Sequence, residues 1–124
     1  MSSATPEAVP HPLVVRTVAV DDPGDLLELL PREEALAWVR RGDGLVGWGE
    51  ALRIEVSGPE RFERAQERWR EALASVVVRD EVALPGTGPV AFGSFSFDDE
   101  GDGVLVVPRV VVGRRGNISW LTTI

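Results

Sequence analysis

The segment from Pro59 to about Val76 is the one clear amphipathic helix in a chain otherwise made of short apolar runs separated by turn residues. Ser57-Gly58-Pro59-Glu60 precedes it and offers a capping serine, an early proline and a glutamate three residues on. Apolar side chains then recur on one helical face: Phe62, Ala65, Trp69, Ala72, Leu73 and Val76. A lone helix of this kind has to bury its apolar face against a sheet.

Runs rich in β-branched and aromatic residues predict the strands of that sheet. These runs are Leu13–Val20, Ala35–Arg40, Leu45–Val56, Val90–Phe97, Val104–Val107, Val110–Arg114 and Ile118–Ile124. Asp25–Leu30 predicts one or two helical turns, and Gly42-Asp43-Gly44 supplies residues that tolerate a tight hairpin. The predicted fold is α+β: an antiparallel sheet, as a β-meander, with one main helix packed on it.

The charge and composition exclude several classes of function. Thirteen basic residues, all of them Arg, stand against twenty acidic ones and give a net charge of −7. This balance argues against nucleic acid or an anionic membrane as a partner. The chain has no Lys and no Cys, so it supplies no Schiff base, lysine base, thiolate or disulfide. The absence of Cys suits a cytoplasmic protein. No apolar run reaches the ~20 residues that cross a bilayer, and residues 1–12 lack the apolar core of a signal peptide.

Two kinds of loop are candidate ligand sites. Asp98–Gly103 resembles the start of an EF-hand loop, but the bidentate glutamate of that motif would fall at Arg109, so a solvated hairpin loop is favoured. Gly86-Thr87-Gly88 and Gly42-Asp43-Gly44 lack the strand, helix and lysine of a phosphate-binding loop, which favours tight turns.

The histidine, tryptophan and glutamate residues of the chain do not form a recognisable catalytic arrangement. His11, the only histidine, lies in residues 1–12, which contain three prolines and are predicted to be a mobile lead-in. Spacing favours core packing for the four tryptophans, Trp38, Trp48, Trp69 and Trp120. The acidic residues Glu50, Glu55 and Glu81 have no evident partner carboxylate for acid–base chemistry. The residues therefore predict no catalytic, cofactor-binding or metal-binding site in this chain.

The run Ile118–Ile124 is apolar and β-branched, and no turn or polar tail follows it. An unpaired apolar strand is an edge that soluble proteins avoid. We therefore expect the chain to be the front part of a longer protein, with its last strand open to self-association or to the missing part.

Several segments, in their order, resemble the N-terminal part of isochorismate synthases, which belong to the chorismate-utilising enzymes. Gly88–Asp98 (GPVAFGSFSFD) followed by Val104–Pro108 (VLVVP) is similar to a glycine-rich strand ending in Phe-Asp and a hydrophobic run into Val-Pro. Gly42–Ala51 (GDGLVGWGEA) resembles the early hairpin of that family, and Pro59–Val76 lies where the family has its first long helix. The resemblance covers residues 13–124, which it identifies as an incomplete N-terminal subdomain.

The resemblance implies an enzyme that adds water to chorismate and expels its 4-hydroxyl, with Mg²⁺ bound to the substrate carboxylate. The general-base lysine, the general-acid glutamate, the metal-binding glutamates and the carboxylate-binding arginine of the family all lie downstream of the matched region. It therefore implies a structural, inactive segment of a synthase serving menaquinone or siderophore supply. Its partner is the missing C-terminal catalytic half, in cis or in trans.

Two alternatives remain open: a stand-alone protein-binding or regulatory module, and a non-functional truncated fragment. The coding sequence after codon 124 distinguishes them, because a downstream half bearing Lys and Glu supports the synthase. The choice between isochorismate and salicylate synthase rests on residues outside this chain.

Overall fold

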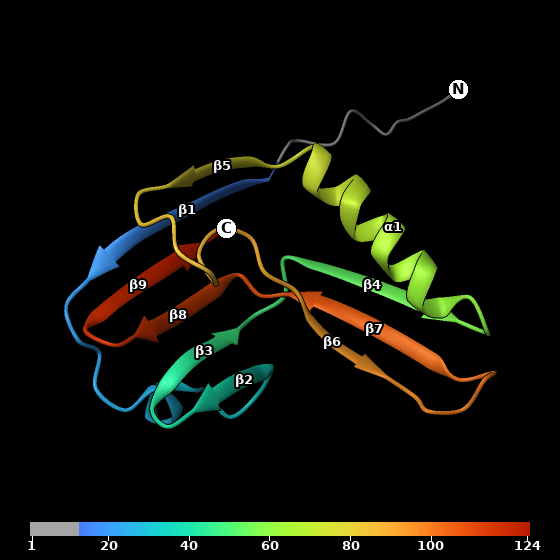
Figure 1. Ribbon diagram of the computed structural model, residues 1–124, viewed down its shortest axis with the longest axis horizontal. Coiled ribbons are helices and arrows are strands. Elements are labelled where there is room, and N and C mark those ends of the chain that lie inside the picture. Colours follow the sequence, from blue (N-terminus) through green and yellow to red (C-terminus); the bar gives the residue numbers. More distant parts are fainter. Residues whose placement is uncertain (1–12) are drawn as a thin grey trace.

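The computed structural model describes residues 13–124, so the predicted lead-in 1–12 lies outside the described residues (Figure 1). The six-stranded sheet has the order β2 (Ala35–Arg40), β3 (Asp43–Trp48), β8 (Val110–Arg115), β9 (Ile118–Thr123), β1 (Val14–Val20) and β5 (Val77–Asp80). The three-stranded sheet has the order β4 (Leu52–Ser57), β7 (Asp102–Val107) and β6 (Phe92–Phe95). One α-helix, α1 (Arg61–Ala74), and a short 3-10 helix, η1 (Leu26–Leu29), complete the described elements.

The predicted α+β class is confirmed, but the predicted single meander is wrong. Every strand pair is antiparallel except β1 with β5, which is parallel. The run of strands after Val90 is divided, since β6 and β7 belong to one sheet and β8 and β9 to the other. Strand β5 was not predicted from the sequence; its four residues follow the helix almost directly.

The two sheets are joined by a two-stranded ribbon that bends. Strand β3 continues into β4, and β7 continues into β8, so both segments of the ribbon pass from one sheet to the other. At the bend the Ala51 amide donates to the Val107 carbonyl at 2.8 Å, and the Arg109 amide donates to the Trp48 carbonyl at 3.1 Å. The prediction of one strand over Leu45–Val56 is therefore wrong, because Gly49, at φ 75°, takes the chain out of the first sheet.

The core of the six-stranded sheet lies on both of its faces. On one face, Leu26 of η1 packs against Val46 and Val112. On the other face Trp120 is 2% exposed, and its indole N–H donates to the Gly86 carbonyl at 3.2 Å, in the loop that follows β5. A Cβ at Gly113 would lie 2.3 Å from the Trp120 ring, so the neighbouring strand needs glycine there.

Helix α1 packs on the three-stranded sheet, with Ala65 against Ile54 and Val56. The helix begins at Arg61 rather than at Pro59, and its N-cap, Glu60, makes no side-chain capping bond. The predicted serine cap is wrong because Ser57 is the last residue of β4.

The apolar face of α1 is narrower than the sequence predicts. Ala65 is buried and Trp69 is half-buried, but Phe62 and Leu73 are exposed. Phe62 stacks on Phe95 with ring centroids 4.7 Å apart and stays 52% exposed. A sheet of three strands offers too little width to cover the whole apolar stripe of the helix.

The last strand, β9, is not the open edge that the sequence predicts. It pairs with β8 on one side and with β1 on the other. Thr122 is buried there, and its hydroxyl hydrogen-bonds the Thr17 hydroxyl of β1 at 2.6 Å. The free edges of this sheet are β2 and β5, and self-association through residues 118–124 stays a prediction.

Replacing Ile54 with alanine should lower the free energy of unfolding by about 2–5 kcal/mol, because it opens a cavity between α1 and the three-stranded sheet. Ile54 is 2% exposed. Phe97→Ala is the control, because the Phe97 side chain is fully exposed and its loss should cost under about 0.5 kcal/mol. Urea unfolding measures both, and equal costs would contradict this core.

Candidate functional site

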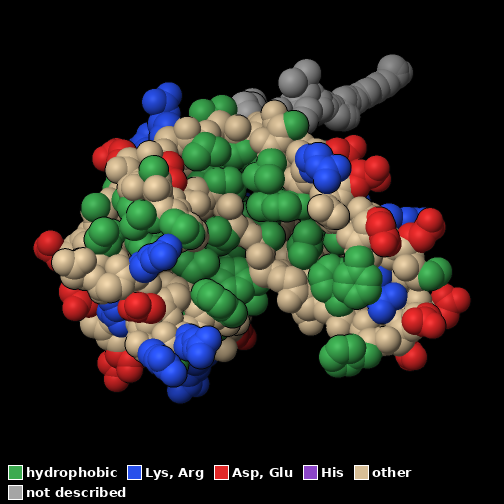
Figure 2. Space-filling model, in the orientation of Figure 1, with side chains coloured by type: hydrophobic (Ala, Val, Ile, Leu, Met, Phe, Trp, Pro, Cys, Tyr) green, Lys and Arg blue, Asp and Glu red, His purple; other side chains and the backbone are tan. Residues whose placement is uncertain are grey.

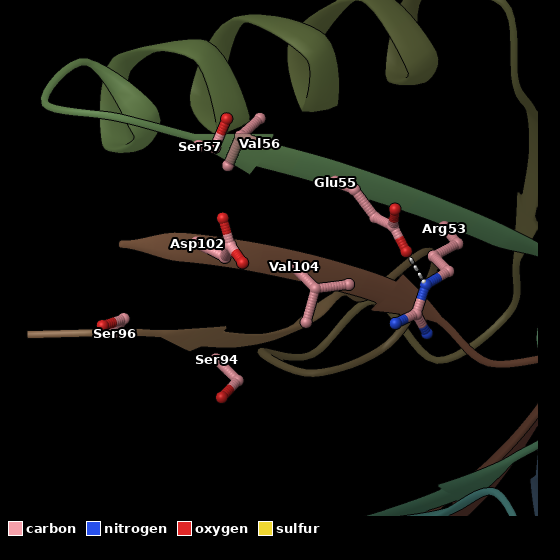
Figure 3. Close-up of a pocket in the computed structure, with 9 residues that line it drawn as sticks. Arg53, Glu55, Val56, Ser57, Ser94, Ser96, Asp102 and Val104 are labelled. Atoms are coloured by element: carbon pink, nitrogen blue, oxygen red, sulfur yellow. Dashed lines mark hydrogen bonds and ion pairs between the residues drawn. The ribbon is translucent and has the colours of Figure 1, made fainter. Parts of the chain in front are cut away.

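The outer face of the three-stranded sheet carries a shallow polar hollow of about 500 Å³ (Figure 3). Because side chains alternate along a strand and Ile54 faces the helix, its neighbours on β4 face outward. The hollow is lined from all three strands and the turn after β6 by Arg53, Glu55, Val56, Ser57, Ser94, Ser96, Asp102, Gly103 and Val104.

Arg53 is the central charge of this face. Its Nε donates to Glu55 at 2.6 Å and its Nη1 donates to Glu50 at 3.3 Å. These hydrogen bonds, to Glu55 first and then to Glu50, hold the pKa of Arg53 above its ordinary value, so the guanidinium stays charged and does not act as a general acid or base at physiological pH. The structure thus joins two of the three predicted glutamates through an arginine, while Glu81 follows β5 on the other sheet.

This arrangement orders surface charges but holds no nucleophile–base pair. The hydrogen bonds that involve Ser96 go to backbone groups and to the Arg61 guanidinium rather than to a base. Within residues 13–124, no three His, Cys, Asp or Glu side chains lie close enough to hold a metal ion. His11 lies outside the described residues. That this chain lacks catalytic, cofactor and metal residues therefore stays a prediction.

The acidic loop Asp98–Gly103 is held by a buried arginine from α1. Arg61 is 4% exposed, and its guanidinium donates to the carbonyls of Gly58 at 3.0 Å, Asp99 at 3.1 Å and Ser96 at 2.7 Å. A calcium loop presents such carbonyls to the ion. Here they accept from a fixed cation, which supports the structural interpretation of the loop. No local sequence pattern indicates this role, because Arg61 is 35 residues from Ser96 and 38 residues from Asp99.

The two glycine-containing loops also use their polar groups internally. Arg41 and Gly42 form the β2–β3 turn with φ values of 56° and 84°, which confirms the hairpin one residue earlier than predicted. In the loop after β5, the Gly88 amide donates to the buried Thr17 hydroxyl at 3.0 Å. Asp80 accepts from the amides of Val82 and Ala83, both at 2.9 Å, and from the Thr87 hydroxyl.

A second, apolar hollow of about 610 Å³ lies between the two sheets. We call it the inter-sheet groove; it is lined by Ala37, Trp38, Leu45, Trp69, Pro89, Val90, Ala91, Phe92, Gly93 and Leu105. Figure 2 shows the molecule hollowed between its two sheets, with hydrophobic side chains gathered beside the hollow. The expectation that all four tryptophans pack in the core is wrong for Trp38, which is 70% exposed. No described helix is both long and apolar enough to cross a membrane.

Comparison with known proteins gives one family and one relative. Residues 13–124 match the model of a family described as chorismate binding enzyme. The chain is 29% identical over 125 residues to the salicylate biosynthesis isochorismate synthase of Pseudomonas aeruginosa. This match covers 89% of the chain and 25% of the relative, so the chain spans about a quarter of that protein's length. No solved structure matches the chain.

Replacing Arg61 with methionine should lower the free energy of unfolding by about 1–3 kcal/mol, because three part-buried hydrogen bonds from its guanidinium to carbonyl groups are lost. Arg64→Met is the matched control one turn along α1, where the side chain is exposed and the loss should stay under about 0.5 kcal/mol. Hydrogen exchange should also quicken at the amides of Ser96 and Gly101, which close the loop. Unchanged exchange in Arg61→Met would contradict the role of the arginine in holding it.

The Asp80 carboxylate should make stability fall in acid. Burial raises the pKa of Asp80, but the hydrogen bonds from Thr87, Ala83 and Val82 outweigh it and leave the pKa below its ordinary value of 3.8. A lowered folded-state pKa gives stability that is present above 3.8 and is lost as the pH falls through the folded value. Urea unfolding of Asp80→Asn should show a flatter pH dependence in that range. Identical slopes for Asp80→Asn and the natural chain would refute the assignment.

Proposed function

Because the chain belongs to the family of chorismate binding enzymes, we propose that it is the structural N-terminal portion of an isochorismate-forming synthase. The single observation that carries this proposal is that the family match runs unbroken over residues 13–124 while the chain spans a quarter of an isochorismate synthase. In this proposal the chain supplies a folded shell, and the remainder of the synthase supplies the reacting groups.

The side chains present support this division of labour. Adding water to chorismate and expelling a hydroxyl needs a base for the water and an acid for the leaving group. The chain has no Lys, and its central arginine face is neutralised by glutamates. No three His, Cys, Asp or Glu side chains gather among the described residues, and we assign the Mg²⁺ implied by the family resemblance to the remainder of the enzyme. The product would serve menaquinone or siderophore supply in the cytoplasm.

A stand-alone protein-binding module is the second candidate. It is favoured by β5, a free edge on which Val77 and Val78 are exposed, since an open strand edge accepts a strand from a partner.

The isolated chain should not convert chorismate to isochorismate, even with Mg²⁺, because it lacks a lysine base. Purified chain is incubated with chorismate and Mg²⁺, and the products are separated by liquid chromatography. Turnover above that of a heat-denatured sample would overturn the structural assignment.

A chimera tests the positive half of the proposal. Residues 13–124 replace the matched quarter of the Pseudomonas synthase, and a variant in which that quarter is deleted is the control. We expect the chimera to form isochorismate and the deletion variant to be inactive. A folded but inactive chimera, or an active deletion variant, would contradict the proposal.

A further inference from the structure

We propose that the inter-sheet groove is the surface on which the remainder of the synthase packs, through uncharged apolar side chains. This inference rests on the proposed function, and it adds the place of contact and the chemistry of the contacting face.

The exposure of two tryptophans beside the groove is the first argument. Trp38 is 70% exposed and Trp69 is half-buried, although both have large apolar rings that gain free energy when they leave water. Leu45 and Phe92 extend the same surface from β3 and β6. A contiguous open patch of this kind marks an interaction surface, whereas single exposed apolar residues do not.

The position of the groove in the fold is the second argument. Two strands that contribute to it, β2 and β6, are the free edges of their sheets. A segment lying there can pair with backbone groups as well as fill the hollow. The opposite face of the six-stranded sheet is already covered by Leu26 of η1, so β2 and β3 leave their open apolar surface on the groove side.

The charge distribution and the length of the relative identify the occupant. None of the residues that line the groove is charged, although the whole chain carries −7. A nucleic acid or an anionic lipid would find no basic surface there. The matched relative has three quarters of its length outside the aligned region. We infer that the corresponding part of the synthase supplies the apolar surface that covers the groove. We therefore commit to the remainder of the synthase rather than to a second copy of this chain.

Cysteine reporters test the contact independently of catalysis, because the chain contains no natural cysteine. Leu45→Cys, at the position paired with Trp38, and Ala91→Cys place thiols in the groove, and Ser75→Cys places one at the exposed end of α1. Each is alkylated in the isolated chain and in the chimera described above, with the labelled position read by mass spectrometry. We expect Leu45→Cys and Ala91→Cys to react at least about tenfold more slowly in the chimera, and Ser75→Cys to react at the same rate in both.

The outcomes separate this proposal from the function it rests on. An active chimera with unprotected groove thiols overturns the docking surface alone, and an inactive chimera with protected thiols overturns the function alone. A chimera that fails to fold, when the parental synthase folds, counts against both. Protection of Leu45→Cys in the isolated chain that rises with concentration means self-association, and it overturns the choice of occupant.

The unfolding midpoint of the variant Trp38→Ser gives a second test, and Phe97→Ser is its control. Both side chains are largely exposed, so neither variant should shift the unfolding midpoint of the isolated chain appreciably. In the chimera only Trp38→Ser should lower the midpoint and restore alkylation of Ala91→Cys. Equal shifts for the two variants would overturn a specific role for the groove.

Discussion

The bent ribbon formed by β3–β4 and β7–β8 is the constraint on which the remaining architecture depends. Two backbone hydrogen bonds, from the Ala51 amide to the Val107 carbonyl and from the Arg109 amide to the Trp48 carbonyl, join the two segments where they pass from one sheet to the other. Because both segments of the ribbon cross together, the two sheets are linked by continuous backbone and not only by packing of side chains. The angle between the sheets therefore comes from backbone geometry at Gly49 and beside Pro108.

The open groove follows from that geometry. Helix α1 covers one face of the three-stranded sheet, and the loop after β5 covers Trp120 on the six-stranded sheet. Between these two coverings, Trp38 and Leu45 have no layer above them within the described residues. The polar face around Arg53 is the opposite case, because its charges already neutralise one another. The apolar hollow, rather than the polar one, is the surface that a partner would stabilise.

Local patterns in the sequence predicted local structure. The 3.6-residue period located α1, and the β-branched runs located most of the strands. A local sequence pattern does not determine which sheet a strand joins. The interruption of the predicted strand at Gly49 and the internal position of β9 in the sheet were therefore not predicted. Arg61 was missed for the same reason, since its three carbonyl partners come from two loops that only the fold brings together. Trp38 shows the limit of periodicity, which predicts a shared face but not whether anything covers it.

The place of β9 makes the order of synthesis matter. Strand β1 is made first of the described strands and β9 last, yet they are neighbours, linked by the Thr17–Thr122 hydroxyl pair. Until β9 leaves the ribosome, β1 has only the four residues of β5 beside it, and β8 has only β3. Pairing between such distant segments is slow to form. The six-stranded sheet therefore cannot be complete before β9 is made, and until then β1 and β8 each keep one unpaired edge.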